Sequence, residues 1–211
     1  MNRKAETLTP QLARRMGQAL MRRLADAGNA GDASADAGVT SPVLVEPAAT
    51  PTAPALLAAR HPGGPQAQRQ AKAMYQRCLT HYRAHIQQGR APDDVAAAAA
   101  WFVAANLEAL HGQAVGIEQI AAVERQLRAV IAGHDGWHAA SLQERQSLFE
   151  QLATLGVLVG ETQAQARTQG PAAIANVQRA ARGYLLQLLG VDADALQLSP
   201  DGLAARVTMQ A

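Results

Sequence analysis

The amino-acid sequence predicts an all-α protein, with a five-helix, bundle-like domain preceded by a disordered linker and an N-terminal amphipathic helix. Two observations lead to this prediction. Apolar residues recur at intervals of three and four over five segments, which is the period of one helix face, whereas no stretch alternates convincingly as a half-buried strand does. Hydrophobic residues make up 48% of the 211 residues but aromatic residues only 3%, so most apolar side chains are small and favour helices.

The folded domain is expected over residues 67–211. Its five helices are expected at about 67–88, 93–111, 117–132, 141–169 and 171–190, each ending at a glycine. The second helix is apolar nearly all round, so we expect it at the centre of the domain. Gly156 and Gly160 in the fourth helix indicate close packing against another helix. After residue 190 we expect a short helical turn and a loop that covers the core.

Two helix starts carry capping signals. Ser141 and Glu144 form a capping box, in which each side chain accepts a hydrogen bond from an unpaired backbone N–H. Asp93 and Asp94 begin the second helix, where carboxylates suit the positive end of the helix dipole. We therefore interpret these two aspartates as caps rather than as an acid–base pair for catalysis.

Residues 1–27 form a basic amphipathic segment. Thr9 is a favourable N-cap, Pro10 a favourable first residue and Gly28 a stop, so a helix is expected over about 9–27. Four arginines lie mostly outside its leucine stripe: Arg14, Arg15, Arg22 and Arg23. Such a helix can lie on an anionic membrane surface, bind a partner's groove, or pack weakly on its own domain.

Residues 28–66 are rich in Gly, Ala, Asp, Ser, Thr and Pro and contain almost no large apolar side chains. A segment of this composition buries too little apolar surface to offset the entropy lost on ordering. We therefore expect a disordered, extended tether between the N-terminal segment and the folded domain.

The first helix of the domain is the strongest candidate for partner binding. No acidic residue occurs between Ala67 and Arg90, and four cations are expected to form a positive face: Arg69, Lys72, Arg83 and Arg90. This face can bind an acidic protein partner or a phosphate backbone, or it can simply be a solvated surface. Trp137, in the loop between the third and fourth helices, is a further candidate for partner contact, or else a lid on the core.

Cys78, His81 and His85 also lie on the first helix, at spacings of three and four. Neighbouring pairs could hold a metal ion, but Cys78 and His85 are about 10.5 Å apart along the axis at 1.5 Å per residue, so one ion cannot reach all three. We therefore expect no metal site and interpret Cys78 as a core side chain. As the single cysteine, it also excludes an internal disulfide.

The sequence lacks the signature motifs of several classes of enzyme and binding protein. No HExxH, GxxxxGK[ST], GxGxxG or GxSxG pattern occurs, so we expect no enzyme activity and no cofactor. The net charge of +2 and the lack of a helix-turn-helix pattern weigh against nucleic acid binding. Neither a signal peptide nor a spanning segment is visible, so a cytoplasmic location is expected, or a periplasmic one if an export signal has been removed.

The segment from about Arg69 to Leu203 resembles an uncharacterised bacterial family of domains of unknown function. The features that carry the resemblance are the early basic helix, the run Arg90-Ala-Pro-Asp-Asp-Val-Ala, His111-Gly112, Leu155-Gly156-Val157-Leu158, and the ending Leu189-Gly190-Val191-Asp192 through Leu198 and Asp201-Gly202-Leu203. The resemblance implies a helical domain, often exported and preceded by an Ala/Pro-rich linker, and thus a connection with the cell envelope. It supplies no catalytic residues.

The sequence thus favours a non-enzymatic helical module that binds a protein partner. Peripheral association with an anionic membrane surface through the N-terminal helix is the alternative, and metal binding by the helical domain is a weaker one. Partner identity, biological process and oligomeric state do not follow from the sequence.

Overall fold

The computed structural model describes residue 18 and residues 43–89, 92–190 and 192–206. In these ranges the protein is mostly helical, with two short antiparallel strand pairs, which confirms the predicted all-α class. The expected N-terminal helix, including Arg14, Arg15, Arg22 and Arg23, lies outside the described residues apart from Gln18.

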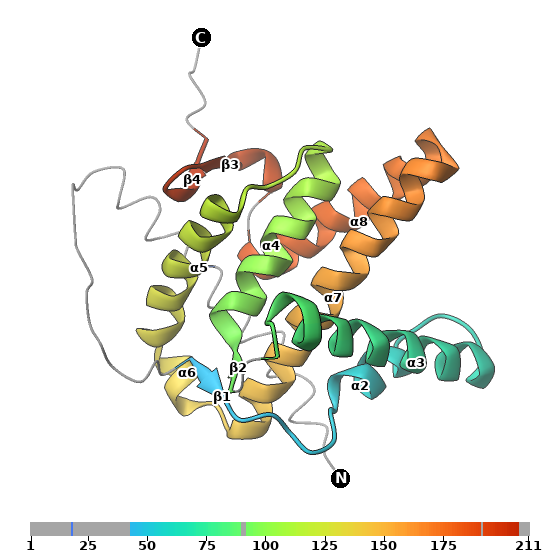
Figure 1. Ribbon diagram of the computed structural model, residues 1–211, viewed down its shortest axis with the longest axis horizontal. Coiled ribbons are helices and arrows are strands. Elements are labelled where there is room, and N and C mark those ends of the chain that lie inside the picture. Colours follow the sequence, from blue (N-terminus) through green and yellow to red (C-terminus); the bar gives the residue numbers. More distant parts are fainter. Residues whose placement is uncertain (1–17, 19–42, 90–91, 191, 207–211) are drawn as a thin grey trace.

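Helices α4 (Val95–His111) and α7 (Leu142–Gln169) form the centre of the domain (Figure 1). Most residues of α4 are buried, as its apolar sequence predicts. The two helices approach closely at Gly156, where an added Cβ atom would lie only 2.7 Å from Cδ1 of Trp101 and 3.2 Å from the Cα atom of Phe102. The expectation of close packing is thus confirmed for Gly156, whereas Gly160 faces open space.

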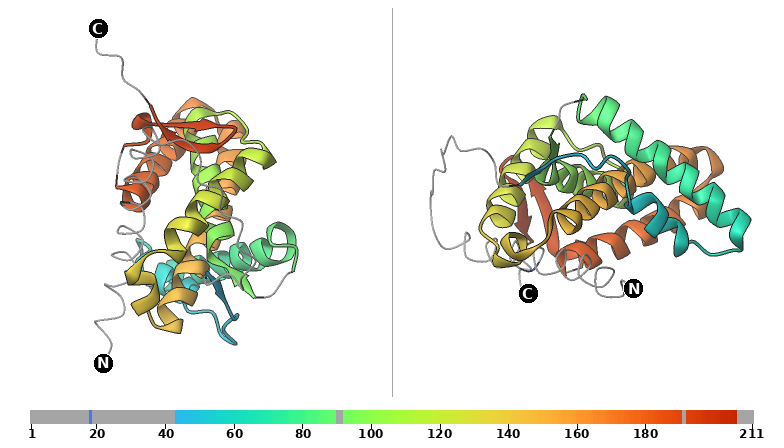
Figure 2. Two further views of the ribbon diagram at one scale, coloured as in Figure 1. Left: turned by 90° about the vertical axis from the view of Figure 1, so that its left-hand side faces the viewer. Right: turned by 90° about the horizontal axis from the view of Figure 1, so that it is seen from below.

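Three further helices pack around this pair. Helix α5 (Ile117–Ala132) lies against α4, and α8 (Pro171–Leu189) lies against both α4 and α7. Helix α3 (Pro65–His81) packs on α7, and Figure 2 shows α3 and α8 on opposite sides of α7. A π-helical turn at Tyr82–Ile86 extends α3. These elements confirm the five predicted helices, with ends that differ by only a few residues.

The start of the described chain corrects the predicted linker. Strand β1 (Leu44–Val45) pairs antiparallel with β2 (Asp93–Asp94), and helix α2 (Ala53–Ala59) packs against α3 and α7. The small side chains of this segment fit into the core. The buried ones are Val43, Val45, Ala53, Pro54 and Ala58. The expectation of disorder is therefore wrong for residues 43–66, while residues 28–42 lie outside the described part.

The end of the chain also contains strands that the apolar pattern does not predict. Strand β3 (Leu196–Ser199) pairs with β4 (Gly202–Ala205), and this hairpin covers α5. The Gln126 side chain of α5 accepts a hydrogen bond from Leu203 N–H and donates one to Leu203 O, at 2.9 and 3.1 Å. Each strand is too short for alternation to be recognised, so the sequence predicts only a covering loop here.

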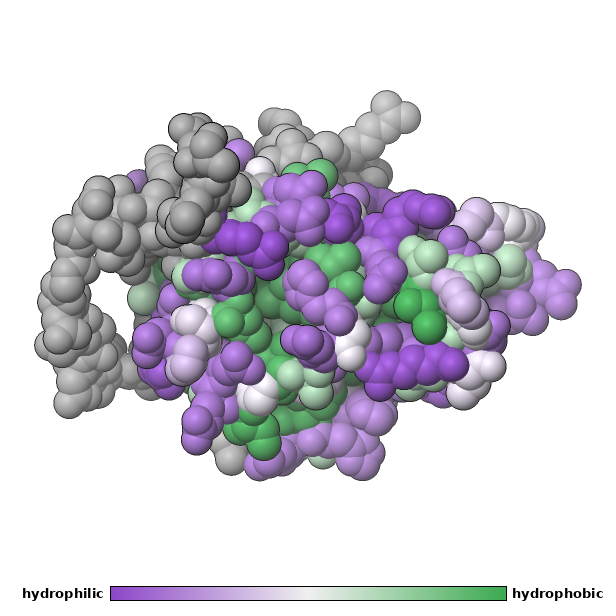
Figure 3. Space-filling view, turned by 90° about the horizontal axis from the view of Figure 1, so that it is seen from above, coloured by the Kyte–Doolittle hydropathy of each residue, from purple (hydrophilic) through white to green (hydrophobic). Residues whose placement is uncertain are grey.

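Figure 3 shows a face of the molecule on which apolar side chains gather in patches among hydrophilic ones. In the described ranges, three large apolar side chains are exposed: Ile117, Leu142 and Leu186. Singly exposed apolar residues are ordinary for a protein surface. The exposed apolar side chains therefore do not mark a binding site, and the distribution of charge is the better guide to one.

Candidate functional site

Helix α3 is amphipathic, and its sequence explains how it is positioned. Pro65 occupies the first turn after Gly64, where its missing N–H costs no hydrogen bond. Its inner side buries Ala71, Tyr75 and Cys78 toward α2 and α7. The other side of the same helix is therefore left to solvent.

The outer side of α3 and the turn that follows it is positively charged. We call this surface the α3 basic face and define it by five exposed residues: Arg69, Lys72, Arg77, His81 and His85. The chain from Pro65 to Ile86 contains no acidic residue. Within the described ranges, Arg69, Lys72 and Arg77 make no salt bridge.

A carboxylate of α7 lies beside the α3 basic face. Oε1 of Glu161 lies 4.0 Å from Nδ1 of His81, and both side chains are about half exposed, at 57% and 48%. A pair at this distance and exposure contributes little to stability and competes weakly with an incoming anion. The two histidine rings lie with their centroids 5.0 Å apart, so His81 and His85 form one end of the α3 basic face.

A shallow depression runs along the α3 basic face. Its lining residues are Ala73, Gln76, Arg77, Thr80, His81, Ala84 and His85. Alanine and threonine side chains are short, so the main chain of a bound segment can approach the helix beside Arg77. Gln76 and Thr80 add side-chain hydrogen-bonding groups to the same surface.

Arg83 does not belong to this face, which corrects the sequence-based assignment. Its guanidinium turns inward and binds Asp93 with two hydrogen bonds, Nη2 to Oδ2 at 2.6 Å and Nε to Oδ1 at 3.2 Å. Asp93 is almost fully buried, and the guanidinium also lies 5.6 Å from the centre of the Phe149 ring. Arg83 therefore ties the π-helical turn to the start of α4. Arg90, the fourth predicted cation, lies outside the described residues.

Trp137 is likewise not a surface contact. It lies in the short helix α6 (Asp135–Ala139), which the sequence predicts as a loop, and its side chain is fully buried. The guanidinium carbon of Arg145 lies 5.0 Å from the centre of its ring system. The structure thus corrects the assignment of Trp137 to a partner site and agrees with its alternative role as a lid on the core.

The structure also separates Cys78 from the two histidines that share its helix. Cys78 is 1% exposed and faces inward, whereas His81 and His85 are exposed. Burial, together with the charge of Glu161, raises the pKa of the Cys78 thiol to about 11, so the reactive thiolate is scarce at neutral pH. Across the described residues, no three His, Cys, Asp or Glu side chains are placed to hold a metal ion.

The predicted aspartate pair has two different roles. Oδ1 of Asp94 accepts hydrogen bonds from Ala96 N–H and Ala97 N–H, as predicted for a cap, and Oδ2 binds Arg128 of α5 at 2.6 Å. Asp93 instead binds Arg83. The two arginines thereby connect the start of α4 to α3 and α5, which holds the helix carrying the α3 basic face in place.

Glu150 is an important residue that the sequence analysis does not identify. Its side chain is 1% exposed, and Oε2 accepts hydrogen bonds from Thr52 N–H and Ala53 N–H at the start of α2, at 2.8 and 2.9 Å. Oε1 has no hydrogen-bond partner within the described part of the chain. Burial raises the pKa of this carboxyl group. No local signal could reveal this contact, because it joins residues almost 100 positions apart.

Comparison with known proteins identifies a family but no activity. No curated protein and no solved structure matches the chain. In the part of the chain that the structure describes, no helix is both long enough and apolar enough to span a membrane. The family described as "Family of unknown function (DUF6683)" matches residues 2–206, and thus nearly the whole sequence. The chain therefore belongs to this family, in agreement with its resemblance to a family of domains of unknown function.

Proposed function

We propose that this protein is a non-enzymatic interaction module that binds an acidic segment of a protein partner through the α3 basic face. The observation that carries the proposal is the placement of Arg69, Lys72 and Arg77 on an exposed helix side that contains no acidic residue. Cations without intramolecular partners are available to bind an external anion.

The electrostatic support comes from the surroundings of the α3 basic face. Two nearby arginines are engaged within the protein, since Arg83 binds Asp93 and Arg128 binds Asp94 and Glu124. Arg69, Lys72 and Arg77, by contrast, make no salt bridge within the described ranges and lie exposed on a single helix. Such a concentration accelerates encounter with an acidic partner and selects against basic ones.

The shape of the surface supports a polypeptide ligand rather than a nucleic acid. The depression beside Arg77 is shallow and contains short side chains, which suits the close approach of an extended or helical segment. The net charge of the chain is only +2, whereas a nucleic-acid-binding domain normally carries a strong positive excess. An acidic peptide segment is therefore the ligand class that the charge and the shape favour together.

The experiment is a comparison of partners recovered from native cells by a tagged chain. The test variant reverses three charges of the α3 basic face, Arg69→Glu, Lys72→Glu and Arg77→Glu. The matched control reverses three exposed arginines on other helices, Arg125→Glu, Arg167→Glu and Arg179→Glu. Both variants change the net charge equally, so a difference between them reports the site and not the overall charge.

The expected result is a partner that the wild-type chain and the control recover but that the test variant loses at least tenfold, because several like-charge contacts would replace attractive ones. Equal recovery by both variants would remove the α3 basic face from the account. Circular dichroism of both variants before the comparison establishes that each is folded.

Membrane-surface association through residues 1–27 remains the alternative, supported by the basic amphipathic sequence. Each lysine or arginine near an anionic surface contributes about 1 kcal/mol. Co-sedimentation with anionic vesicles at low salt tests this alternative, with an Arg14→Gln, Arg15→Gln, Arg22→Gln, Arg23→Gln variant as the comparison. Binding that depends on these four arginines, without a recovered protein partner, would favour the membrane over the proposed acidic segment.

A further inference from the structure

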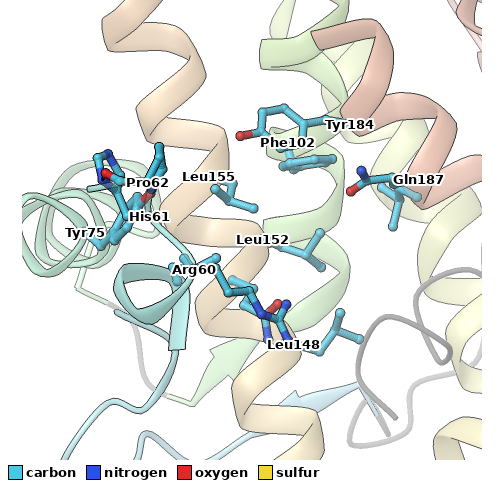
Figure 4. Close-up of a pocket in the computed structure, with 13 residues that line it drawn as sticks. Arg60, His61, Pro62, Tyr75, Phe102, Leu148, Leu152, Leu155, Tyr184 and Gln187 are labelled. Atoms are coloured by element: carbon cyan, nitrogen blue, oxygen red, sulfur yellow. Dashed lines mark hydrogen bonds between the residues drawn. The ribbon is translucent and has the colours of Figure 1, made fainter. Parts of the chain in front are cut away.

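A cleft with a volume of about 420 Å³ lies between the α2–α3 connection, α7 and α8 (Figure 4). Leu152 and Leu155 of α7 line its middle, and Phe102 of α4 and Tyr184 of α8 lie at one end. Tyr75 of α3 lies across from them. The volume is in the range of sites for small molecules, roughly 300–1,000 Å³.

Most of the cleft surface is apolar, because leucine and aromatic side chains line it. Burying the exposed leucine and aromatic surface beneath a ligand is favourable, so this lining suits a hydrocarbon chain. Small-molecule sites typically combine such an apolar lining with a few polar groups that fix the orientation of the ligand.

The polar groups of the cleft are suited to an anion. Arg60 lies at the end opposite Tyr184, with its guanidinium beside Leu148 (Figure 4). The Gln187 amide faces the cleft. None of the lining residues is acidic. In the described ranges the Arg60 guanidinium has no salt-bridge partner, so its charge is available to a ligand.

The two tyrosine hydroxyls add to this preference. Burial raises the pKa of Tyr184, and burial together with nearby Tyr184 raises that of Tyr75. Both hydroxyls therefore stay protonated at neutral pH and can donate hydrogen bonds. The cleft thus presents donors and one cation around an apolar interior, without a competing negative charge.

We propose that this cleft binds a free single-chain carboxylate, with the hydrocarbon chain against Leu152 and Leu155 and the carboxylate at Arg60. The charge of Arg60 selects the anionic head group, and the apolar lining selects the chain. This site is separate from the α3 basic face, which lies on the outer side of α3. An experiment can therefore contradict one of the two proposals without affecting the other.

The test is calorimetric titration of the full chain with decanoate below its micelle concentration, compared with decanol and decyltrimethylammonium. We expect decanoate to bind at one site, decanol to bind more weakly, and the cation to bind least. Arg60→Gln is expected to weaken decanoate at least tenfold and leave decanol unchanged. The control Arg179→Gln, on the exposed side of α8, is expected to change neither affinity.

A second variant and a label test the location of the chain. Leu155→Trp fills the middle of the cleft and is expected to abolish binding of decanoate and decanol. A decanoate that carries a photoreactive group at its far end is expected to label peptides of α4, α7 or α8 in the wild-type chain. This measurement uses the wild-type chain, so it does not depend on the folding of a variant. Absence of decanoate binding, unchanged affinity in Arg60→Gln, or labelling confined to helices that do not line the cleft would overturn the proposal.

Discussion

At the scale of single residues, Glu150 joins two distant parts of the chain. Its buried carboxyl group accepts hydrogen bonds from the first N–H groups of α2, and thereby holds residues 43–59 against α7. Gln146, one turn earlier on α7, donates a hydrogen bond to the carbonyl oxygen of Glu46 in the same segment. One side of α7 therefore fixes the start of the domain.

Replacing Glu150 by alanine is expected to lower the free energy of unfolding by about 2–3 kcal/mol, because it leaves two backbone N–H groups without a partner. Urea denaturation measures this change. Glu150→Gln is the milder comparison, since its amide oxygen can accept the same two hydrogen bonds. A loss below about 0.5 kcal/mol in the alanine variant would contradict the role given to this carboxyl group.

Glu150 is also expected to make the stability of the protein depend on pH. Burial raises the pKa of Glu150 in the folded protein above its ordinary value of 4.5, so the folded state keeps the proton to a higher pH than the unfolded state does. Its contribution to stability is therefore largest below that ordinary value and decreases as the pH rises through the raised one. The stability of wild type relative to Glu150→Gln is expected to fall as the pH rises above 4.5. A constant or rising difference in paired denaturation curves would contradict this.

Gly156 and Gly160 form a matched pair on α7. Gly156→Ala places a methyl group 2.7 Å from Cδ1 of Trp101 and is expected to cost about 1–3 kcal/mol of stability. Gly160→Ala meets no atom within 4 Å and is expected to stabilise by up to about 1 kcal/mol, because alanine restricts the unfolded chain. Thermal denaturation of both variants compares them directly, and equal effects would contradict the close approach of α4 and α7.

Residue-level signals in the sequence predict local contacts well and distant ones poorly. The Ser141–Glu144 capping box and the Asp94 cap are confirmed, because each joins residues at most three positions apart. The burial of Trp137 and the contacts of Glu150 depend on which helices pack together. Arg83 similarly looks like a surface cation in the sequence, since its partner Asp93 resembles a simple helix cap.

At the scale of elements, Arg83 and Arg77 of the α3 region allow a structural role to be distinguished from a binding role. Arg83→Ala leaves Asp93 buried without its partner and is expected to cost about 2–4 kcal/mol. Arg77→Ala removes an exposed cation and is expected to change stability by less than about 0.5 kcal/mol. Urea denaturation checks both. Similar losses for the two variants would place Arg77 in the packing of α3 and weaken its proposed role in binding.

Strand β1 and helix α2 are also expected to stabilise the domain. A chain that begins at residue 63 lacks Val43, Val45 and Ala53, which are buried, and leaves Glu150 without its two N–H partners. It is expected to unfold at a clearly lower urea concentration than a chain that begins at residue 43. Equal midpoints would show that residues 43–62 add nothing to the core.

The sequence predicts the five long helices because each carries a helical stripe or a long apolar run with a clear end. It predicts disorder for residues 43–66 because β1 and α2 contain few large side chains and bury small ones. Their order depends on hydrogen bonds to Glu150 and on the pairing of β1 with β2, which composition does not reveal. The site is predicted in part: Arg69 and Lys72 lie on the α3 basic face, whereas Arg83 and Trp137 do not.

At the scale of the whole molecule, the architecture turns one side of α3 outward. Helices α5 and α8 pack against the central helices α4 and α7, and α3 packs on α7 (Figure 2). The side of α3 that faces α7 is the apolar one. The pair Arg83–Asp93 connects the end of α3 to the start of α4, and the pair Arg128–Asp94 connects α5 to the same place. The α3 basic face is thus presented by a fixed helix, which suits a binding surface because little order has to be gained on association.

The most direct test of this account is photo-crosslinking in native cells from a photoreactive residue at position 76, between the cations of the α3 basic face. The comparison places the same residue at Gln165, an exposed position on α7. The account predicts one prominent crosslinked protein from position 76, joined through a segment rich in aspartate or glutamate, and no such product from position 165. No product from position 76, or the same product from both positions, would contradict it.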